Sequence, residues 1–246
     1  MERTFILRLD ASIGTTSVDE RTRDLFVDDL HRLRDASLGV QGELVQPIGQ
    51  GFNNLTLTNS LGLKLSRFEA DFATFDSQTA SLYSGVNRAT AASNMSLGLR
   101  SILAASSLPD RRIHTAELGL SRRLNAAFFL SFAGYRGTQS GGNTPDTDIW
   151  GQSLGLTISD PLGGTALQNI RLSLGVTTSQ AEAPNAEVLS TTAARTERES
   201  FGITQTYGLG PNTFILVDLL FSDQGSNIPN GRVSDWTLSF SIPRRF

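Results

Sequence analysis

Apolar and polar residues alternate with a period of two along most of this chain. Between residues 55 and 66, Leu stands at most odd positions, and Thr, Ser, Gly or Lys stands at the even positions. The same pattern recurs in 150–159, 170–177 and 236–242. Successive side chains of a β-strand point to opposite faces, so each segment has one apolar face and one small or polar face.

The alternation predicts about twelve β-strands, or about fourteen if weaker stretches form strands of their own. We place the twelve near residues 3–13, 35–46, 54–66, 80–88, 94–103, 112–123, 126–137, 148–159, 169–179, 198–208, 212–222 and 234–246. The weakest stretch is 67–79, whose alternation either extends a neighbouring strand or forms a further one.

Long polar connections alternate with short ones along the predicted strands. The long ones are 14–34, 67–79, 104–111, 138–147, 180–197 and 224–233; the short ones are 47–53, 89–93, 124–125, 160–168 and 209–211. The segment 14–34 contains a helical candidate. Ser17 and Glu20 have the spacing of a capping box, and Phe26, Leu30 and Leu33 share a helical face. Such a helix would either plug or narrow a barrel, or lie in a surface loop.

The composition of the polar face decides between a soluble sheet and a membrane barrel. Both show the same alternation, and no apolar run in the 246 residues approaches the roughly 18 residues of a membrane helix. The polar face, however, is made of Gly, Ser and Thr, not of the Lys and Glu of a soluble sheet. Together with the alternating connections, this predicts an all-β protein: a single antiparallel, up-and-down transmembrane β-barrel over 1–246.

Charge and cysteine content exclude several classes of protein. The formal net charge is −3, which gives no basic face for nucleic acid. The absence of Cys excludes a disulfide scaffold, a zinc-finger site and a thiol nucleophile. No signal peptide precedes the first alternating segment. We therefore expect the sequence to be a mature chain, or the C-terminal barrel part of a longer protein.

The last segment, Trp236 to Phe246, resembles the C-terminal strand of Gram-negative outer-membrane β-barrels. Those strands end in Phe and carry hydrophobic residues at alternate preceding positions, whereas Pro243 and Arg244 depart from the pattern here. The resemblance implies a location in the cell outer membrane, contact with its lipid and lipopolysaccharide, and recognition of this strand by the barrel-assembly machinery. We expect aromatic girdle or assembly-signal roles for four residues, Trp150, Trp236, Phe240 and Phe246.

Shorter segments resemble export proteins. The stretches 118–124, 128–135 and 153–164 are similar to hairpins of fimbrial ushers, and 32–65 is similar to a hairpin of two-partner secretion transporters. The lumen motif of the second family, Val-Arg-Gly followed by Tyr or Phe, is absent from this chain. These resemblances favour export over passive uptake.

Charged residues on the small, polar faces are the candidates for a lumen. They are Arg8, Asp10, Glu43, Lys64, Arg100, Glu117, Arg171 and Asp218. Both signs occur, which indicates either a mildly polar pore or charge pairs that fill a closed barrel. An inward Asp218 also places Phe214, Leu216 and Leu220 inward, for which the sequence offers no reason.

The leading hypothesis is a channel or export translocator that passes a polar solute or polymer through its lumen. The alternative is a non-conducting barrel that serves as a membrane anchor or adhesin with long external loops. A lipid hydrolase would use His31 or His114, but no nucleophile motif accompanies either residue. A soluble β-sandwich is a fourth possibility. We expect no catalytic residue, cofactor or metal site.

Overall fold

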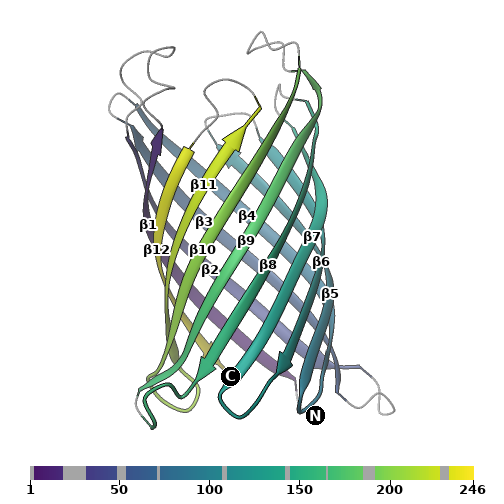
Figure 1. The fold of residues 1–246 in the computed structure, drawn as a ribbon, viewed down its shortest axis with the longest axis vertical. Coiled ribbons are helices and arrows are strands. Elements are labelled where there is room, and N and C mark those ends of the chain that lie inside the picture. Colours follow the sequence, from purple (N-terminus) through teal and green to yellow (C-terminus); the bar gives the residue numbers. More distant parts are fainter. Residues whose placement is uncertain are drawn as a thin grey trace.

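The described residues form twelve antiparallel β-strands that close into one barrel (Figure 1). The computed structural model describes residues 3–18, 32–48, 54–70, 73–106, 110–141, 145–164, 166–184, 192–227 and 233–246. The strands are β1 (Thr4–Val18), β2 (Arg32–Pro47), β3 (Leu55–Ala70), β4 (Ala73–Ala89), β5 (Ser93–Ser106), β6 (Arg111–Arg123), β7 (Phe128–Ser140), β8 (Thr147–Ser159), β9 (Leu167–Pro184), β10 (Ala193–Gly208), β11 (Phe214–Ser226) and β12 (Val233–Arg245). The prediction of a twelve-stranded, up-and-down barrel is confirmed.

Each strand pairs with its neighbours in sequence, and β1 pairs with β12 to close the barrel. Both chain termini lie at one end, the lower end in Figure 1. The strands lean in one direction, so a row of paired residues climbs or descends as it crosses them. No helix in the described part of the chain is long and apolar enough to cross a membrane.

Several strands are longer than predicted, because they continue into the polar segments at the upper end. The stretch 67–79 is mostly strand: β3 runs to Ala70 and β4 begins at Ala73. The prediction of a helix capped by Ser17 is wrong, because Ser17 lies in β1 and pairs with Arg32 of β2. Leu33 also lies in a strand, β2. The remaining residues of the candidate helix, Glu20, Phe26 and Leu30, lie outside the described residues.

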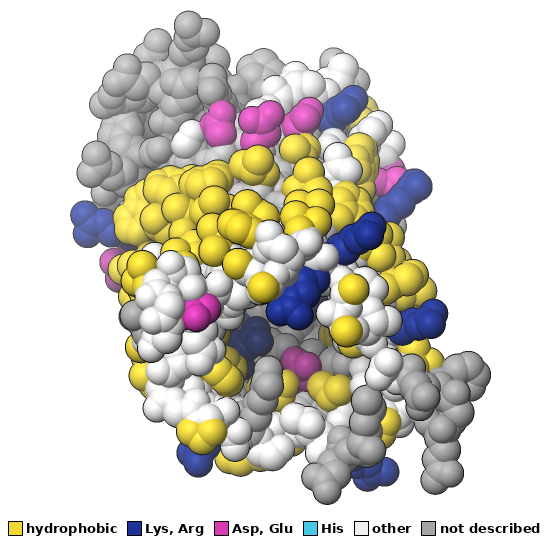
Figure 2. All heavy atoms as spheres, turned by 60° about the horizontal axis from the view of Figure 1, so that its bottom comes forward, with side chains coloured by type: hydrophobic (Ala, Val, Ile, Leu, Met, Phe, Trp, Pro, Cys, Tyr) yellow, Lys and Arg dark blue, Asp and Glu magenta, His cyan; other side chains and the backbone are white. Residues whose placement is uncertain are grey.

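Most apolar side chains in the described part of the barrel lie on the outside, in contrast to a soluble protein. None of its hydrophobic residues is buried, and Leu38 and Leu99 are each 68% exposed. Figure 2 shows hydrophobic side chains gathered over the wall and charged side chains inside the hollow end. Such a largely apolar exterior is stable against lipid, where the paired strands leave no backbone group unsatisfied.

Adjacent residues of β4 test which face meets lipid. Leu82 faces outward and is 57% exposed, whereas Ser81 lines a cavity on the opposite face. We expect Leu82→Arg to lower the free energy of unfolding by about 2–4 kcal/mol, because a cation then faces hydrocarbon. Ser81→Arg should cost about 1 kcal/mol or less, because its side chain reaches water in the lumen. Urea titration of both variants in lipid vesicles measures the difference; equal losses would contradict the assignment of faces.

Candidate functional site

The strand register places all eight predicted charged residues on the inner face of the barrel. Asp10 pairs with Gly39, which pairs in turn with Lys64 of β3. The residues on either side of these positions, such as Leu9, Leu38 and Leu63, are the exposed apolar ones. The same alternation, carried from strand to strand, turns Arg8, Asp10, Glu43, Lys64, Arg100, Glu117, Arg171 and Asp218 inward.

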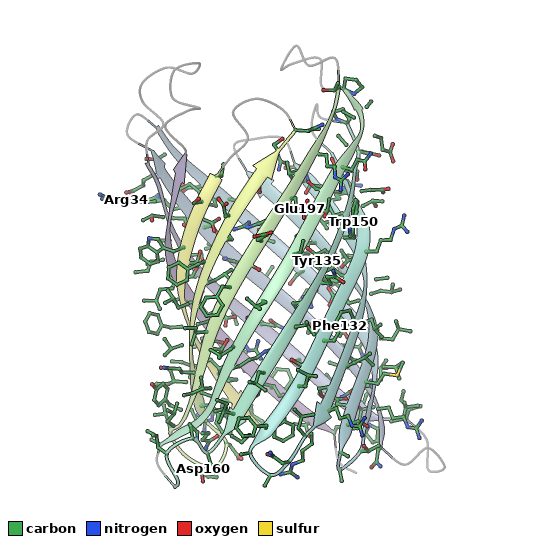
Figure 3. The ribbon with its side chains drawn as sticks, in the orientation of Figure 1. Arg34, Phe132, Tyr135, Trp150, Asp160 and Glu197 are labelled. Carbon is green, nitrogen blue, oxygen red and sulfur yellow. The ribbon has the colours of Figure 1, made fainter. Side chains whose placement is uncertain are left out.

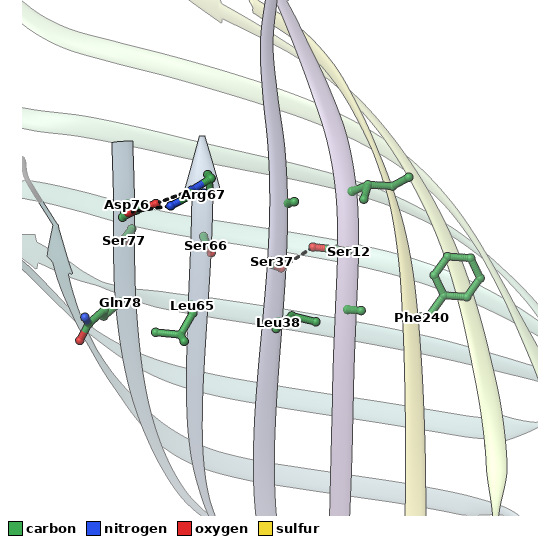
Figure 4. A pocket seen from close by; sticks show the side chains of 13 residues that line it. Ser12, Ser37, Leu38, Leu65, Ser66, Arg67, Asp76, Ser77, Gln78 and Phe240 are labelled. Atoms are coloured by element: carbon green, nitrogen blue, oxygen red, sulfur yellow. Dashed lines mark hydrogen bonds and ion pairs between the residues drawn. The ribbon is translucent and has the colours of Figure 1, made fainter. Parts of the chain in front are cut away.

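A row of serines crosses five adjacent strands on this inner face. The register joins Ser239, Ser12, Ser37, Ser66 and Ser77, from β12 through β1 to β4. The hydroxyls of Ser12 and Ser37 are 2.5 Å apart and hydrogen-bonded, as Figure 4 shows. Short hydroxyl side chains leave the centre of a barrel open and supply hydrogen-bonding groups to whatever occupies it.

An ion pair projects from the wall formed by β5 and β6. The Arg100 guanidinium donates to both carboxylate oxygens of Glu117, at 2.5 and 3.2 Å, and the Thr115 hydroxyl donates to Glu117 at 3.2 Å. Arg100 also lies 5.1 Å from the ring centroid of Tyr83. The Tyr83 ring covers Gly98, where an added Cβ would come within 2.4 Å of it. Gly at this position therefore lets the ring lie flat along the wall.

Three of the other six predicted lumen charges, Asp218, Asp10 and Arg171, have hydroxyl partners instead of opposite charges. The Thr204 hydroxyl donates to Asp218 at 2.6 Å, and the Ser241 hydroxyl donates to Asp10 at 2.5 Å. Arg171 donates to the Ser131 hydroxyl at 3.4 Å. These partners hold the charges without neutralising them, so both signs remain available to a solute in the lumen.

A second ion pair near the upper end was missed by the sequence analysis. Arg198 of β10 contacts Asp235 of β12 across β11, and both bind the Ser222 hydroxyl between them. Residues 195–200 are all polar, so no apolar residue marks which positions face outward. Only the strand register shows that the Arg198 side chain points inward. Tyr83 was also missed, although its neighbours Ser81 and Gly85 mark the odd positions of β4 as the small, polar face.

Two cavities in the lumen share three of their lining residues. The larger, about 750 Å³, includes Arg8, Arg171 and Asp218 among its lining residues. The smaller, about 380 Å³, reaches Lys64 and Arg100. Asp10, Ser239 and Ser241 line both, so the two cavities are neighbouring parts of one polar space. The register also turns Phe214, Leu216 and Leu220 inward, and Leu216 lines the larger cavity with Phe129.

The four predicted aromatic girdle residues all lie on the outer side or at the edge of the barrel. Trp150 faces outward in the upper half, as Figure 3 shows, and Trp236 pairs with Thr15 near the upper end of β1. Phe240 is exposed and lies between them and the lower end. Phe246 stands at the lower end, where its ring centroid is 6.2 Å from that of Phe5.

The histidines do not assemble a hydrolytic site in the described structure. His114 lies on the outer face of β6, where its Nδ1 is hydrogen-bonded to the Ser101 hydroxyl at 3.0 Å. No carboxylate partner of His114 is found among the described residues, and His31 lies outside them. Within the described ranges, no cluster of His, Asp and Glu has the arrangement of a metal site.

No family model matches this chain, and no curated protein is similar to it in sequence. Solved structures are similar in fold. An outer-membrane channel from Pseudomonas putida F1 is 13% identical over 99% of this chain and 95% of that chain, with a TM-score of 0.65. The β-domain of the Bordetella autotransporter BrkA is 11% identical over 98% and 99%, with a TM-score of 0.57. The translocator domain of the autotransporter NalP from Neisseria meningitidis is 13% identical over 100% and 89%, with a TM-score of 0.54.

The chain has the fold of an outer-membrane β-barrel. The fold confirms the predicted resemblance to Gram-negative outer-membrane β-barrels and the predicted location in the cell outer membrane. The barrel's likeness to fimbrial ushers and two-partner secretion transporters stays a prediction.

Removing one member of the Arg100–Glu117 pair tests its contribution to the barrel. The two side chains are 35% and 28% exposed, so water screens part of their attraction. We expect Arg100→Gln and Glu117→Gln each to lower the free energy of unfolding in lipid, with a coupling of about 0.5–1 kcal/mol in the double-mutant cycle. The cycle of Lys64→Gln with Glu117→Gln is the control, since the charge of Lys64 acts on Asp35 and not on this pair, so no coupling is expected. A coupling of zero would show that the pair does not stabilise the wall.

Proposed function

We propose that the protein is an outer-membrane channel that passes small polar solutes through its lumen. The observation that carries the proposal is the polar space that the two lumen cavities form around Asp10, Ser239 and Ser241. Hydroxyl and charged groups line this space, and the lipid-facing side chains point away from it. Solved structures with this fold include an outer-membrane channel, which supports the same function.

The lining groups favour a small solute that is neutral or carries both charges. Arg8 and Arg171 line the same cavity as Asp10 and Asp218, so neither sign prevails there. A single-sign selectivity filter would instead show a ring of like charges. The Arg100–Glu117 pair and Tyr83 take up space beside the smaller cavity, which favours a small solute over a polymer. Phe129 and Leu216 add an apolar patch on which part of a solute can rest.

The apolar exterior and the aromatic residues near the two ends of the barrel support a location in the outer membrane. The apolar exterior faces lipid, and Trp236 and Phe246 lie toward opposite ends of β12. We infer that lipopolysaccharide surrounds the upper half, and that the assembly machinery reads β12 during insertion. No enzymatic step is part of this proposal.

Adjacent residues of β12 test the pore. Ser239 lines both cavities, whereas Leu238 faces outward. We expect the wild-type protein to conduct ions in a planar bilayer, and Ser239→Trp to lower the single-channel conductance by about half or more, because the indole fills the lumen. Leu238→Trp should leave the conductance unchanged. Absence of conductance in the wild-type protein would contradict the proposal and favour the non-conducting anchor.

A charge reversal tests whether the lumen cations meet the solute. Arg171 lines the larger cavity, and Arg67 lies on the outer wall, where it binds Asp76 at 3.0 Å. We expect Arg171→Glu to shift the reversal potential under a salt gradient toward cation selectivity. The larger cavity then keeps one positive charge, Arg8, and gains a negative charge in place of the second. Arg67→Glu should not shift it. Equal shifts in both variants would show that the current does not pass the larger cavity.

A further inference from the structure

Two polar side chains face lipid on the outer wall formed by β8, β9 and β10. Gln152 pairs with Val176, and Val176 pairs with Glu199, so the three form one row across adjacent strands. Gln152 and Glu199 are both exposed, and their neighbours along the strands are the lipid-facing Leu154 and Phe201. The structure gives Glu199 no ion pair or hydrogen bond among the described residues. The cost of a carboxylate on the outer wall is small near the membrane interface, but a partner from outside the chain would remove it, which makes this unpartnered position a candidate for contact with another molecule.

These residues line a groove of about 530 Å³ on the outer wall. Its apolar walls come from Phe132, Leu154, Leu174 and Phe201, and Gln152 and Glu199 supply its polar edge. The groove extends toward β7, because the residue paired with Gln152 there is Gly134, which has no side chain. Apolar packing with a few polar groups is how transmembrane segments associate within lipid.

A cation stands on the other side of this groove at about the same level as Glu199. Arg136 of β7 is exposed, pairs with Trp150, and has no partner among the described residues. The row through Arg136 and Trp150 continues to Thr178 and Glu197, rising toward the upper end because the strands lean. Glu199 lies two residues below Glu197 on β10, which leaves it only about 4 Å above the level of Arg136 at a strand tilt near 40°, within the length of an Arg side chain. Figure 3 shows Trp150 and Glu197 in the upper half of this wall, above Phe132.

We propose that this wall binds a second copy of the same chain. A two-fold axis parallel to the barrel, lying between β8 and β9, would bring β7 of each copy opposite β10 of the other. Arg136 of each copy then faces Glu199 of its partner, and the two ion pairs form symmetrically on either side of the apolar groove. Gln152 lies close to the axis, where its amide faces the other copy's wall.

The charge pattern favours a second copy over a bound lipid. A lipid phosphate would be attracted by Arg136 but repelled by Glu199 across the same groove. A second copy satisfies both charges at once, because β7 and β10 are equally far from the axis. Self-complementary patches of this kind are the feature of a two-fold interface. By contrast, Arg67 and Asp76 on the wall of β3 and β4 bind each other within one chain.

Charge exchange in the full chain tests the interface. The sequence has no Cys, so Ala126→Cys on the lower turn gives one fluorescent label per chain. Photobleaching steps in bilayers that contain lipopolysaccharide count the copies per assembly. We expect the wild-type protein to dimerise, and Arg136→Glu or Glu199→Arg alone to weaken dimerisation about tenfold or more, because like charges then meet across the interface. The exchanged double variant should restore it to within about threefold.

Arg67→Glu serves as the matched control, because it reverses a charge on a distant part of the outer wall and should leave dimerisation unchanged. Circular dichroism shows whether each variant has folded before its copies are counted. The proposal is overturned if the wild-type protein is monomeric at all protein-to-lipid ratios. It is also overturned if the single reversals still dimerise, or if the double variant does not recover. Conductance is measured in a separate experiment. Because each barrel encloses its own lumen, a monomer can conduct, and a failure of the dimer is distinguishable from a failure of the channel.

Discussion

Closure of the barrel is the constraint on which the rest of the structure depends. In lipid, every backbone N–H and C=O group must be paired, so a sheet with free edges cannot cross a membrane. Here β1 and β12, the first and last strands of the chain, pair along nearly their whole length. At the lower end, Phe246 donates its backbone N–H to the Phe5 carbonyl at 2.9 Å. The C-terminal aromatic residue therefore completes the seam as well as the outer wall.

The register at this seam also fixes which residues meet water. A shift of one residue would turn every side chain of a strand to the other face. In the observed register, Asp10 faces inward and accepts a hydrogen bond from Ser241 across the seam, whereas Leu9 and Ile242 face lipid. The polar lumen and the apolar exterior are two results of one pairing pattern. A solute path and a protein–protein contact can thus lie on opposite sides of the same strands.

The sequence predicts the parts of this structure that depend on alternation alone. Strand number and the inward orientation of residues such as Lys64 follow from a period of two, whereas barrel closure was predicted from the Gly, Ser and Thr of the polar face and from the alternating connections. Strand ends do not, because beyond the apolar band polar residues can extend a strand or form a loop; β1 continues to Val18 for this reason. Side-chain contacts between different strands could not be predicted from the sequence either. The Arg198–Asp235 pair spans three strands, and the Tyr83 ring over Gly98 requires the register of β4 against β5.

Cysteine accessibility along β9 tests most directly whether one side of the barrel wall faces water and the other faces lipid. The chain has no Cys of its own, so each variant carries one reactive thiol. In lipid nanodiscs, a small, water-soluble maleimide should label Cys at Ser173 and Thr177, which face the lumen, and should leave Cys at Leu172 and Leu174 unlabelled. Labelling without this alternation, or labelling of the leucine positions alone, would contradict a water-filled barrel with a lipid-facing exterior.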